Sequence, residues 1–375
     1  MNEILIDVFV IFCGLYAIIY IFAAMMISAG ERRFRSGELP SDLPDVSVIV
    51  CARNEEHGIC RCIESLQRLD YPREKLEILL VDDESEDRTL EIINDYSAKN
   101  SIIKILSTEE EPCSFPGKQR PLELSLRNAK GEIVILTDAD CAVAPGWIKA
   151  HVMAYHENTG IVGGITAVSS DSGGLFSPIQ NCDQVSKLAV AMGCAGLNVP
   201  LTIMGNNMSF RRRAYDECGG FSAIGPAIVE DVELMYAITR NSSYSPGWAA
   251  GNESVVVSTR EKNFRAFIEQ RYRMLGVMKK VPLFGKILLG IEILMAFLFG
   301  TALLVMPWDL RPFAAAILTW ICGTYLVLLP APGITSKDLL CIPGMLLFQV
   351  VYGIVLCFRF LLGRKKVTWK GREYG

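Results

Sequence analysis

The sequence predicts an α/β domain with a mostly parallel, doubly wound sheet, flanked by membrane segments. Three observations support this prediction. Short apolar runs alternate with helical segments through the middle of the chain, polar clusters follow three of those runs, and long apolar stretches lie near both ends. Strands that alternate with helices form parallel sheets, because each helix carries the chain back across the sheet.

The strand and helix units follow one another directly in the first half of the domain. Each expected strand is a short run rich in Val, Ile and Leu, and each expected helix has apolar residues at helical spacing. The expected strands are Val46–Ala52, Leu76–Val81, Ile102–Leu106 and the apolar part of Gly131–Cys141, and the expected helices are a segment that ends near Leu69, Arg88–Lys99 and Pro121–Asn128.

Polar clusters follow three of these strands. They are Arg53-Asn54-Glu55-Glu56, Asp82-Asp83-Glu84-Ser85 and Asp138-Ala139-Asp140. Doubly wound sheets bind ligands outside the carboxyl ends of their strands, so the clusters indicate one binding edge. For Asp82 and Asp83, a helix cap formed with Ser85 is an equally good interpretation.

The pair Asp138 and Asp140 indicates a metal site. Alternate residues of an extended chain point the same way, so both carboxylates can meet one object. Two carboxylates held this close repel each other unless a cation lies between or beside them. Because Mg²⁺ and similar hard cations prefer oxygen ligands, we expect Mg²⁺ or Mn²⁺ here, together with a phosphorylated ligand.

Two later segments have open interpretations. Glu230 and Asp231 precede an apolar helical run, where they are either functional or simply acids favoured in the first turn of a helix. Phe176–Met192 is amphipathic, and it either lines the entrance for an acceptor or is an ordinary helix packed on the sheet.

The ends of the chain contain candidate membrane segments. Ile4–Ser28 has a single charge, Asp7, and lacks the small-residue cleavage site of a secretory signal, so we expect an uncleaved anchor. Arg32, Arg33 and Arg35 follow it and place the next segment in the cytoplasm. Three more candidates are Ile287–Met306, Pro312–Leu329 and Leu339–Leu362.

Three C-terminal crossings conflict with the charge of the tail. They would leave the tail outside, whereas Arg364, Lys365 and Lys366 favour the cytoplasmic side. One segment is therefore expected to be re-entrant or interfacial, and Pro312–Leu329 is the weakest candidate. Asn263–Lys280 carries aromatic and aliphatic residues at helical spacing among Lys and Arg, which predicts an amphipathic helix on the membrane surface.

These features divide the chain into five expected regions. They are an anchor at 1–30, a cytoplasmic catalytic-type domain at 45–262, an interfacial helix at 263–282, membrane segments at 283–363 and a basic tail at 364–375.

The composition narrows the function. A net charge of −4 gives no sign of a nucleic-acid partner. The 12 cysteines lack the paired spacing of a zinc site and fit a reducing cytosol. With only 3 histidines in the chain, any general base is expected to be a carboxylate.

Together the motifs resemble the family-2 inverting glycosyltransferases of the GT-A fold. The resemblance covers nearly the whole chain and is carried by Ala-Arg-Asn-Glu at 52–55, Asp82-Asp83, Asp-Ala-Asp at 138–140, Glu230-Asp231 and Gln270-x-x-Arg273. Membrane-anchored members such as the ceramide glucosyltransferases are the most similar, and the cellulose synthases are more distant. The tail from Trp369 to Tyr374 also looks like that of bacterial carotenoid and lipid glycosyltransferases.

The resemblance implies a role for each motif on the donor side. Asp140, assisted by Asp138, would hold Mg²⁺ or Mn²⁺ against the diphosphate of a nucleotide sugar, where the ion offsets the charge that builds on the leaving group. Asp82 and Asp83 would meet uracil and ribose. Arg53, Glu55 and Lys118 would lie near the nucleotide.

The resemblance also implies roles on the acceptor side. Asp231, next to Glu230, would be the base that deprotonates the acceptor, which contributes about 10²–10⁴-fold in such enzymes. Gln270 and Arg273 would neutralise the diphosphate from the membrane side. The family usually has Trp after the Gln-x-x-Arg pair, whereas this chain has Met274. A flexible thioether suits an apolar acceptor better than a sugar chain.

The expected protein is therefore an enzyme of the cell (inner) membrane, multi-pass, with its catalytic domain in the cytoplasm. It would transfer a single sugar from a UDP-sugar donor to a membrane lipid acceptor such as a glycolipid or carotenoid. The alternatives are a processive polysaccharide synthase, a polyprenyl-phosphate glycosyltransferase and, more distantly, a non-catalytic membrane scaffold.

Overall fold

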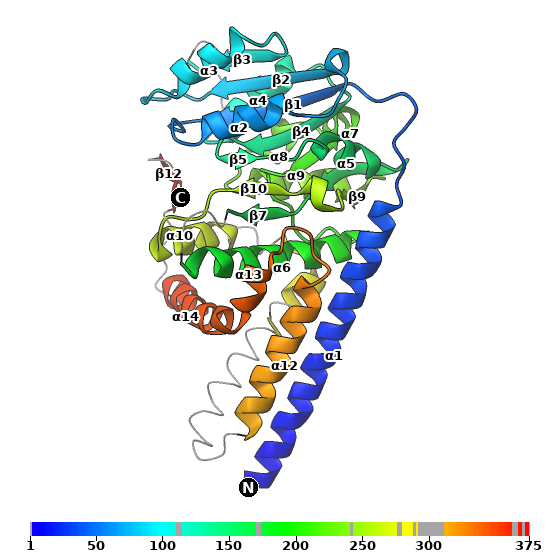
Figure 1. Cartoon of the computed structure of the whole chain (residues 1–375), viewed down its shortest axis with the longest axis vertical. Coiled ribbons are helices and arrows are strands. Elements are labelled where there is room, and N and C mark those ends of the chain that lie inside the picture. Colours follow the sequence, from blue (N-terminus) through cyan, green and yellow to red (C-terminus); the bar gives the residue numbers. More distant parts are fainter. Residues whose placement is uncertain are drawn as a thin grey trace.

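The computed structural model describes residues 2–109, 115–169, 174–240, 243–275, 280–287, 290–291, 311–361, 367–369 and 372–374. Figure 1 shows an α/β domain at one end of the molecule and two long helices, α1 (Asn2–Arg35) and α12 (Arg311–Leu328), that run side by side away from it. The predicted span Ile287–Met306 and the basic residues Arg364–Lys366 lie outside the described residues, apart from 287, 290 and 291.

The centre of the domain is a seven-stranded sheet in the order β3-β2-β1-β4-β8-β6-β9. The strands are β1 (Val46–Ala52), β2 (Leu76–Asp82), β3 (Ile103–Ser107), β4 (Ile133–Asp138), β6 (Thr159–Gly163), β8 (Met208–Arg211) and β9 (Ser245–Trp248). The first four pair in parallel as predicted. Strand β8 is antiparallel to both of its neighbours, so the sheet is mixed.

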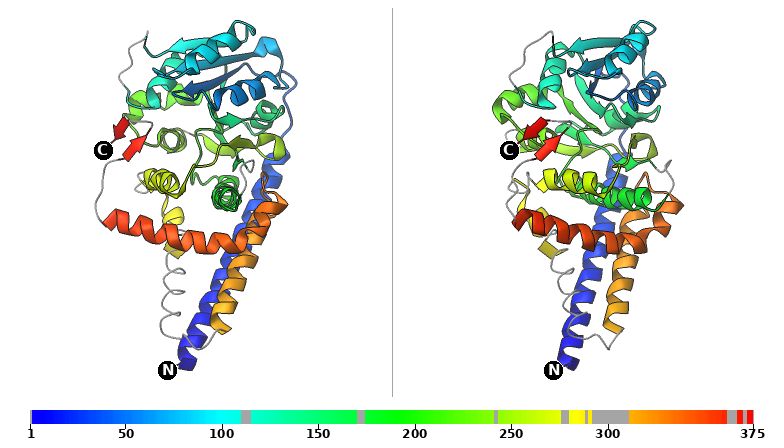
Figure 2. Two further views of the ribbon diagram at one scale, coloured as in Figure 1. Left: turned by 60° about the vertical axis from the view of Figure 1, so that its left-hand side comes forward. Right: turned by 90° about the vertical axis from the view of Figure 1, so that its left-hand side faces the viewer.

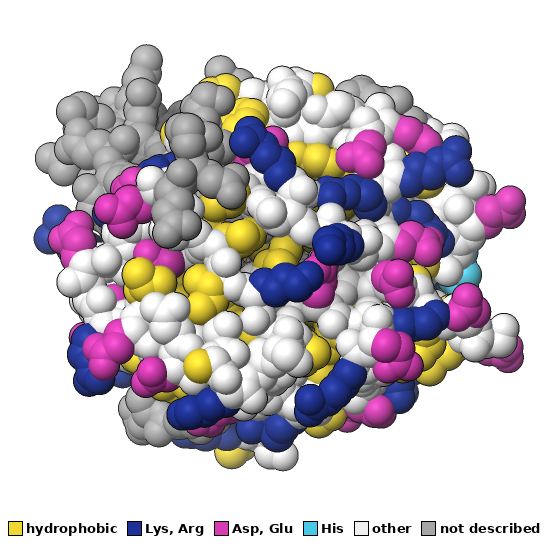
Figure 3. Space-filling view, turned by 90° about the horizontal axis from the view of Figure 1, so that it is seen from above, with side chains coloured by type: hydrophobic (Ala, Val, Ile, Leu, Met, Phe, Trp, Pro, Cys, Tyr) yellow, Lys and Arg dark blue, Asp and Glu magenta, His cyan; other side chains and the backbone are white. Residues whose placement is uncertain are grey.

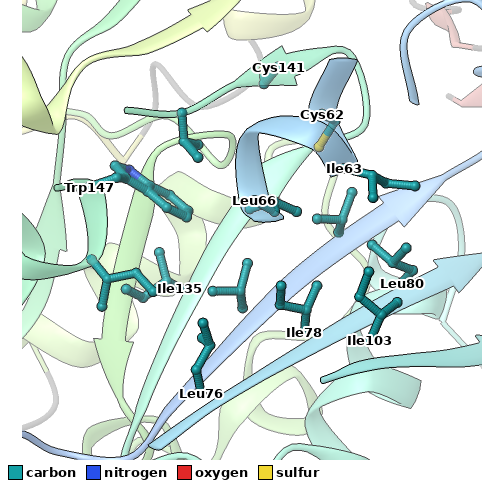
Figure 4. Packing of buried hydrophobic residues seen from close by; sticks show 14 of the residues in the cluster. Cys62, Ile63, Leu66, Leu76, Ile78, Leu80, Ile103, Ile135, Cys141 and Trp147 are labelled. Atoms are coloured by element: carbon teal, nitrogen blue, oxygen red, sulfur yellow. The ribbon is translucent and has the colours of Figure 1, made fainter. Parts of the chain in front are cut away.

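Helices cover both faces of this sheet, which makes it doubly wound. Helices α2 (Ile59–Gln67), α3 (Thr89–Ser97) and α5 (Trp147–Met153) pack on one face, and α4 (Gln119–Asn128), α7 (Arg212–Glu217), α8 (Gly220–Ile224) and α9 (Glu230–Arg240) pack on the other. Figure 4 shows Ile63, Leu66 and Trp147 against the strand residues Ile78 and Ile135. Strands covered on both faces are almost wholly apolar, as the sequence of β1 is.

A second sheet of three short strands, in the order β5-β10-β7, lies beside the first. The strands are β5 (Cys141–Ala142), β7 (Thr166–Val168) and β10 (Val256–Ser258). Because β5 follows the turn at Asp138 directly, this sheet connects the predicted metal motif to the segment that leads into α10 (Phe264–Met274).

Helix α6 (Phe176–Gly196) forms a layer between the domain and the long helices (Figure 1). Its apolar residues are buried in one cluster with side chains of α1 and α12, among them Ile27 and Trp320. This favours the packing interpretation of the amphipathic segment Phe176–Met192. The crossing of α1 and α6 is close: a Cβ on Gly30 would lie 3.0 Å from the carbonyl oxygen of Met192.

By length and hydropathy, two described helices could cross a membrane. They are Val10–Arg35 within α1 and Ile342–Arg359 within α14 (Ile342–Leu361), whereas Ala314–Leu328 is a shorter apolar helix. The prediction of two to three C-terminal membrane helices is therefore corrected to one candidate span among the described residues. Helix α12 matches the helix predicted at Pro312–Leu329 to within a residue at each end, and it stops before Pro330 and Pro332 because proline cannot continue a helix.

Helix α14 does not run with α1 and α12. Figure 2 shows it lying across the end of that pair nearest the domain, beneath α6 and α10. A short helix, α13 (Ser336–Leu340), leads into it, and the chain ends in a hairpin of β11 (Val367–Trp369) and β12 (Arg372–Tyr374). Helix α10 covers the first part of the predicted amphipathic segment and starts at the N-cap Asn263, whose side chain accepts a hydrogen bond from the amide of Ala266.

Candidate active site

The register of the parallel strands brings the polar clusters to one edge of the sheet. Ala52 of β1 pairs with Asp82 of β2, Cys51 pairs with Asp138 of β4, and Asp82 pairs with Ser107 of β3. The turns that follow these strands therefore start at the same level. This is the arrangement that the strand order predicts for a ligand-binding edge.

The turns after β1 and β2 are locked together by backbone and side-chain hydrogen bonds. Arg53 donates from Nη1 to the carbonyl oxygen of Asp83 at 2.7 Å, and the amide of Asn54 donates to Oγ of Ser85 at 3.1 Å. Asn54 and Glu84 both have left-handed backbone conformations, with φ of 54° and 57°. Non-glycine residues adopt this conformation mainly where surrounding contacts hold it, which is common at binding sites.

Glu55 is tied to the same pair of turns. Its amide donates to Oγ1 of Thr89 at 2.7 Å, and its carbonyl oxygen accepts from the amide of Gly58 at the start of α2. Arg53 and Glu55 thus help to shape the edge on which any nucleotide would lie.

Asp82 and Asp83 are almost fully buried, with 3% and 2% of their surface exposed. Asp83 accepts a hydrogen bond from Oγ1 of Thr108 at 2.9 Å, and Oδ2 of Asp82 accepts from the amide of Ser85 at 3.2 Å. Within the described part of the chain, Oδ1 of Asp82 is buried without a hydrogen-bond partner. A buried acceptor of this kind is costly unless a ligand supplies a donor.

The helix-cap interpretation of Asp82 and Asp83 does not fit the structure. Helix α3 begins at Thr89, and the carboxylate that accepts from the amide of Thr89, at 2.9 Å, belongs to Asp87. Asp82 and Asp83 lie before this helix and are left for another role.

The Asp-Ala-Asp motif forms the turn between β4 and β5. Asp138 accepts a hydrogen bond from Nζ of Lys118 at 2.5 Å, and Oδ2 of Asp140 accepts from Oγ1 of Thr259 at 2.6 Å. Gly58 at the start of α2 packs directly on this turn, since a Cβ there would lie 3.1 Å from Cα of Asp140. The motif is therefore held by α2, by α4 and by the segment after β10.

The donor set of this turn fits a divalent cation that is shared with a ligand. Among the described residues no group of three or more His, Cys, Asp or Glu side chains could enclose a metal by itself. Asp138 and Asp140 supply two carboxylates, and Mg²⁺ in phosphate-binding sites is typically held by one or two carboxylates plus phosphate oxygens and water. Asp138 is 35% exposed, which leaves room for such a ligand.

Lys118 joins this turn to the acidic start of α9. Its Nζ lies 2.5 Å from Oδ1 of Asp138 and 4.0 Å from Oε1 of Glu230. Burial opposes the charge of Lys118, yet Asp138 and Glu230 together raise its pKa above the ordinary value, so the ammonium stays charged. One cation thereby brings the strand-end motif and the Glu230-Asp231 pair into a single site.

Glu230 and Asp231 are more than first-turn acids that face water. Burial raises the pKa of both carboxyls, that of Glu230 to about 7. Oδ2 of Asp231 accepts from the amide of Gly205 at 2.6 Å, and Oδ1 accepts from the amide of Val232 at 2.8 Å. A partly buried carboxylate with fixed orientation and a raised pKa is suited to accept a proton.

The buried His151 is not available for this role. His151 is fully buried, its two ring nitrogens bond to Ser209 and Asn207, and burial lowers its pKa to about 4. It is a structural residue of α5.

Helix α10 carries Gln270 and Arg273. The charges of Arg273 and Asp140 both affect Glu261: burial raises its pKa, Arg273 opposes that increase, and Asp140 adds to it. The arginine in the middle of the motif, Arg271, points elsewhere and pairs with the buried Asp183 of α6 at 2.6 Å.

The strand-end motifs lie within a stretch of the sequence that matches a known family profile. The profile described as "Glycosyl transferase family 2" matches residues 47–219, which include Asp82, Asp83, Lys118, Asp138 and Asp140. The chain belongs to glycosyl transferase family 2. This confirms the resemblance that the motifs indicated.

Curated relatives of this family-2 glycosyltransferase include enzymes of lipid glycosylation. The β-monoglucosyldiacylglycerol synthase of Trichormus variabilis is 27% identical over 60% of this chain and 47% of its own length. A probable glycosyltransferase of Bacillus subtilis is 30% identical over 52% of this chain and 47% of its own length. The chain thus spans about half the length of these relatives.

A solved structure shows the same fold. The mannosyltransferase of Pyrobaculum calidifontis, in complex with GDP-Man and Mn²⁺, superimposes with a TM-score of 0.58 at 20% identity over 97% of this chain and 100% of the other. The family-2 glycosyltransferase described here therefore has a GT-A-like mixed-sheet domain.

Sequence reasoning did not single out three residues that contact the predicted motifs or lie near them. Thr259 and Glu261 lie in an irregular polar segment, and Asp183 lies within a long helix. Nothing in their local sequence marks them, because their role depends on contacts with Asp140 and Arg271, which are far away in the chain.

Proposed function

We propose that this glycosyltransferase is a membrane-bound inverting enzyme that transfers a single sugar from a UDP-sugar to a hydroxyl group of a membrane lipid. The observation that carries the proposal is the position of Lys118 between Asp138 and Glu230. This position supports a single site in which the Asp138 turn would bind the donor and the partly buried Glu230-Asp231 pair would supply the base, as a direct displacement requires.

On the donor side, Asp82 and Asp83 would recognise the nucleoside. The buried Oδ1 of Asp82 is suited to accept a hydrogen bond from an N–H of a base. Arg53 and Glu55 shape the turn beneath the nucleotide, and Lys118 adds positive charge near the diphosphate.

Asp138 and Asp140 would hold Mg²⁺ or Mn²⁺ on the diphosphate. When bound, the ion supplies Lewis-acid stabilisation of the negative charge that develops on the leaving group. The relative from Pyrobaculum calidifontis was solved with Mn²⁺ and a nucleotide sugar, which supports this assignment.

Asp231 would accept the proton of the acceptor hydroxyl. The amides of Gly205 and Val232 fix its carboxylate, and burial raises its pKa. Glu230 would tune that pKa and hold Lys118. Gln270 and Arg273 of α10 would contact the diphosphate, and the effect of both Arg273 and Asp140 on the pKa of Glu261 supports a position of Arg273 near this turn.

A lipid acceptor is supported by the relatives and by the apolar helices. The relative from Trichormus variabilis is a β-monoglucosyldiacylglycerol synthase, and two of the described helices of this chain are long and apolar enough to cross a membrane. Met274 lies beside Arg271, with Sδ 3.6 Å from Nη1, where the family usually has Trp. This favours a single transfer over a processive polysaccharide synthase. We place the domain on the cytoplasmic side of the cell membrane.

The test is release of nucleoside diphosphate from UDP-sugars and GDP-mannose by the purified full chain in lipid vesicles with Mn²⁺. Asp231→Asn is expected to lower release by about 10²–10⁴-fold. Asp216→Asn, a matched change at an exposed position of α7, should leave it unchanged. Equal release from wild type and Asp231→Asn would remove Asp231 from the mechanism.

Mass spectrometry of the lipid product then separates the alternatives. One added sugar on a lipid supports the proposal, whereas a polymer supports a processive synthase. If the enzyme turned over GDP-mannose and none of the UDP-sugars, the donor in the proposal would have to be GDP-mannose.

A further inference from the structure

We infer that α14 lies flat on the membrane surface, with one apolar face in the lipid, and does not cross the bilayer. The partner of this face is the headgroup and upper acyl region of a bilayer. The inference rests on the proposed membrane attachment and is independent of the sugar-transfer chemistry.

The two sides of α14 differ in what they contact. Leu347, Val351, Ile354 and Phe358 recur at spacings of four and three residues, which aligns them on one side of a helix. They are 69%, 44%, 52% and 63% exposed. A stripe of large exposed apolar side chains along a whole helix marks an interaction surface.

The opposite side of α14 is bound to the domain by polar contacts. Arg359 forms two hydrogen bonds of 2.6 Å with the carboxylate of Glu269 in α10. The hydroxyl of Tyr352 donates to the buried Asp183 of α6 at 2.8 Å, and the amide of Gln349 donates to the same carboxylate at 3.3 Å.

An aromatic cluster reinforces these contacts. The rings of Phe348 and Tyr352 in α14 lie 4.9 and 5.3 Å from that of Phe267 in α10, measured between centroids. A spanning helix would have to leave α6 and α10 and carry Gln349, Tyr352 and Arg359 into hydrocarbon without these partners. Polar groups in that position are strongly unfavourable.

The direction of α14 identifies lipid as the occupant of the exposed face. Helices α1 and α12 run together away from the domain, and α14 lies across them where they leave it (Figure 2). In α1, Met26, Ile27 and Phe34 are buried, whereas Val10, Ile18 and Met25 are exposed. The segment Asn2–Met25 is therefore free to cross about 30 Å of hydrocarbon, since a helix rises about 1.5 Å per residue. The exposed stripe of α14 faces that same layer.

Charge agrees with this orientation. A flat α14 keeps both of its ends on one side of the bilayer, and the sequence after it contains Arg364, Lys365 and Lys366, which the positive-inside rule assigns to the cytoplasmic side. It also holds α10, which carries Gln270 and Arg273, at the level of the headgroups through the pair of Arg359 and Glu269.

The experiment measures depth along the helix. Single cysteines at Leu347, Val351, Ile354 and Phe358 are introduced in the full chain after the exposed Cys322 and Cys357 are replaced by Ser. Each is labelled with an environment-sensitive fluorophore in vesicles of phosphatidylcholine and phosphatidylglycerol. Spin-labelled lipids carry the quencher either near the headgroup or near the end of the acyl chain. Ile11, Ile18 and Met25 of α1 are labelled for comparison.

If α14 lies flat, quenching by the headgroup probe should be about twofold or more stronger than quenching by the acyl-chain probe at all four α14 positions. The reason is that interfacial helices lie only about 5–10 Å into the boundary between headgroups and acyl chains. The α1 positions should show a gradient, with Ile18 deep. Deep quenching at Val351 combined with shallow quenching at Phe358 would show that α14 spans the bilayer and overturn the inference.

Two other outcomes also overturn it. Quenching at α1 with none at α14 would mean that the stripe faces water or protein. No quenching at either helix would remove the membrane attachment itself, and with it the inference, whereas loss of sugar transfer with normal quenching would affect the proposed function alone.

Discussion

Lys118 sets the charge balance of the site at the scale of single residues. Its side chain is 17% exposed and lies between two carboxyls, so it offsets part of the repulsion between Asp138 and the Glu230-Asp231 pair. Glu230 and Asp231 are adjacent carboxyls, so the charge on one affects the protonation of the other. The pH dependence of transfer should therefore report on Glu230 as well as on Asp231.

We predict that transfer rises with pH through the neutral range and that Glu230→Gln moves this rise to lower pH. The base acts only when it is deprotonated. Burial raises the pKa of Glu230 to about 7 and also raises the pKa of Asp231, so the pair loses its protons at a higher pH than ordinary carboxyls do. Removing the neighbouring negative charge is expected to lower the pKa of Asp231, because a like charge disfavours ionisation. The measurement is kcat/KM against pH, with UDP affinity as the control for folding. If kcat/KM of Glu230→Gln rose with pH over the same range as that of the wild type, the two carboxyls would not be coupled.

We predict that Asp140→Ala abolishes Mn²⁺-dependent binding of UDP. The change removes one of two carboxylates from a site that depends on the ligand for its remaining oxygens. Calorimetric titration with and without Mn²⁺ measures the loss, and Asp95→Ala on the exposed side of α3 serves as the control. Unchanged Mn²⁺-dependent affinity would contradict the metal assignment.

Among single residues, the sequence predicted those that stand at the end of a strand or directly after it. Asp82, Asp83, Asp138 and Asp140 end up together because parallel strands in register end at one edge. Thr259 and Glu261 were not predictable, because they approach Asp140 only through the pairing of β10 with β5.

At the scale of elements, the crossing of α1 and α6 shows how the long helix is fixed to the domain. Gly30, Gly193 and Gly196 meet there, and a Cβ on Gly196 would lie 3.0 Å from Cα of Gly30. Small residues at a crossing allow two helix backbones to approach closely. Helix α1 is therefore packed against the domain and is more than a tether.

We predict that Gly30→Leu lowers the thermal stability of the full chain, by about 1–3 kcal/mol for an overpacked contact. Even the first added carbon would lie 3.0 Å from the backbone oxygen of Met192 and 3.2 Å from Cα of Gly193. Gly14→Leu in the same helix is the matched control, because a Cβ there has nothing within 4 Å. Thermal unfolding in detergent compares the two. Equal midpoints would mean that the crossing is not tight in solution.

The elements that sequence reasoning missed depend on distant partners. Local patterns predicted β1, β2, β3 and β4 to within a residue or two. The direction of α14 was not predictable from its apolar composition, because it is set by Glu269 and Asp183 on two other helices. The antiparallel β8 follows α6 and a loop, with no regular crossover from β4 to indicate its direction.

At the scale of the whole molecule, charge and apolar surface are separated along the long axis. The end of the domain farthest from the N-terminus of α1 carries interspersed Lys, Arg, Asp and Glu (Figure 3). The opposite end exposes apolar side chains of α1, including Ile11 and Ile18 at 62% each. Such a molecule is expected to sit in a membrane by burying apolar surface and not by charge, since its net charge is −4 and anionic lipids would repel it.

We predict that concentrated salt and alkaline carbonate leave the full chain in the membrane fraction. Salt screens electrostatic attachment but does not weaken the burial of an apolar helix. Replacing Ile11 and Ile18 together by Lys should release a large share of the protein, because each charge inside the bilayer costs about 2.5–3.5 kcal/mol or more. Lysines placed at Ser101 and Ser222, which are exposed on the domain, provide the charge-matched control and should release none. Release of the unaltered chain by salt alone would assign its attachment to surface charge, and α1 would then have to be a helix packed outside the bilayer.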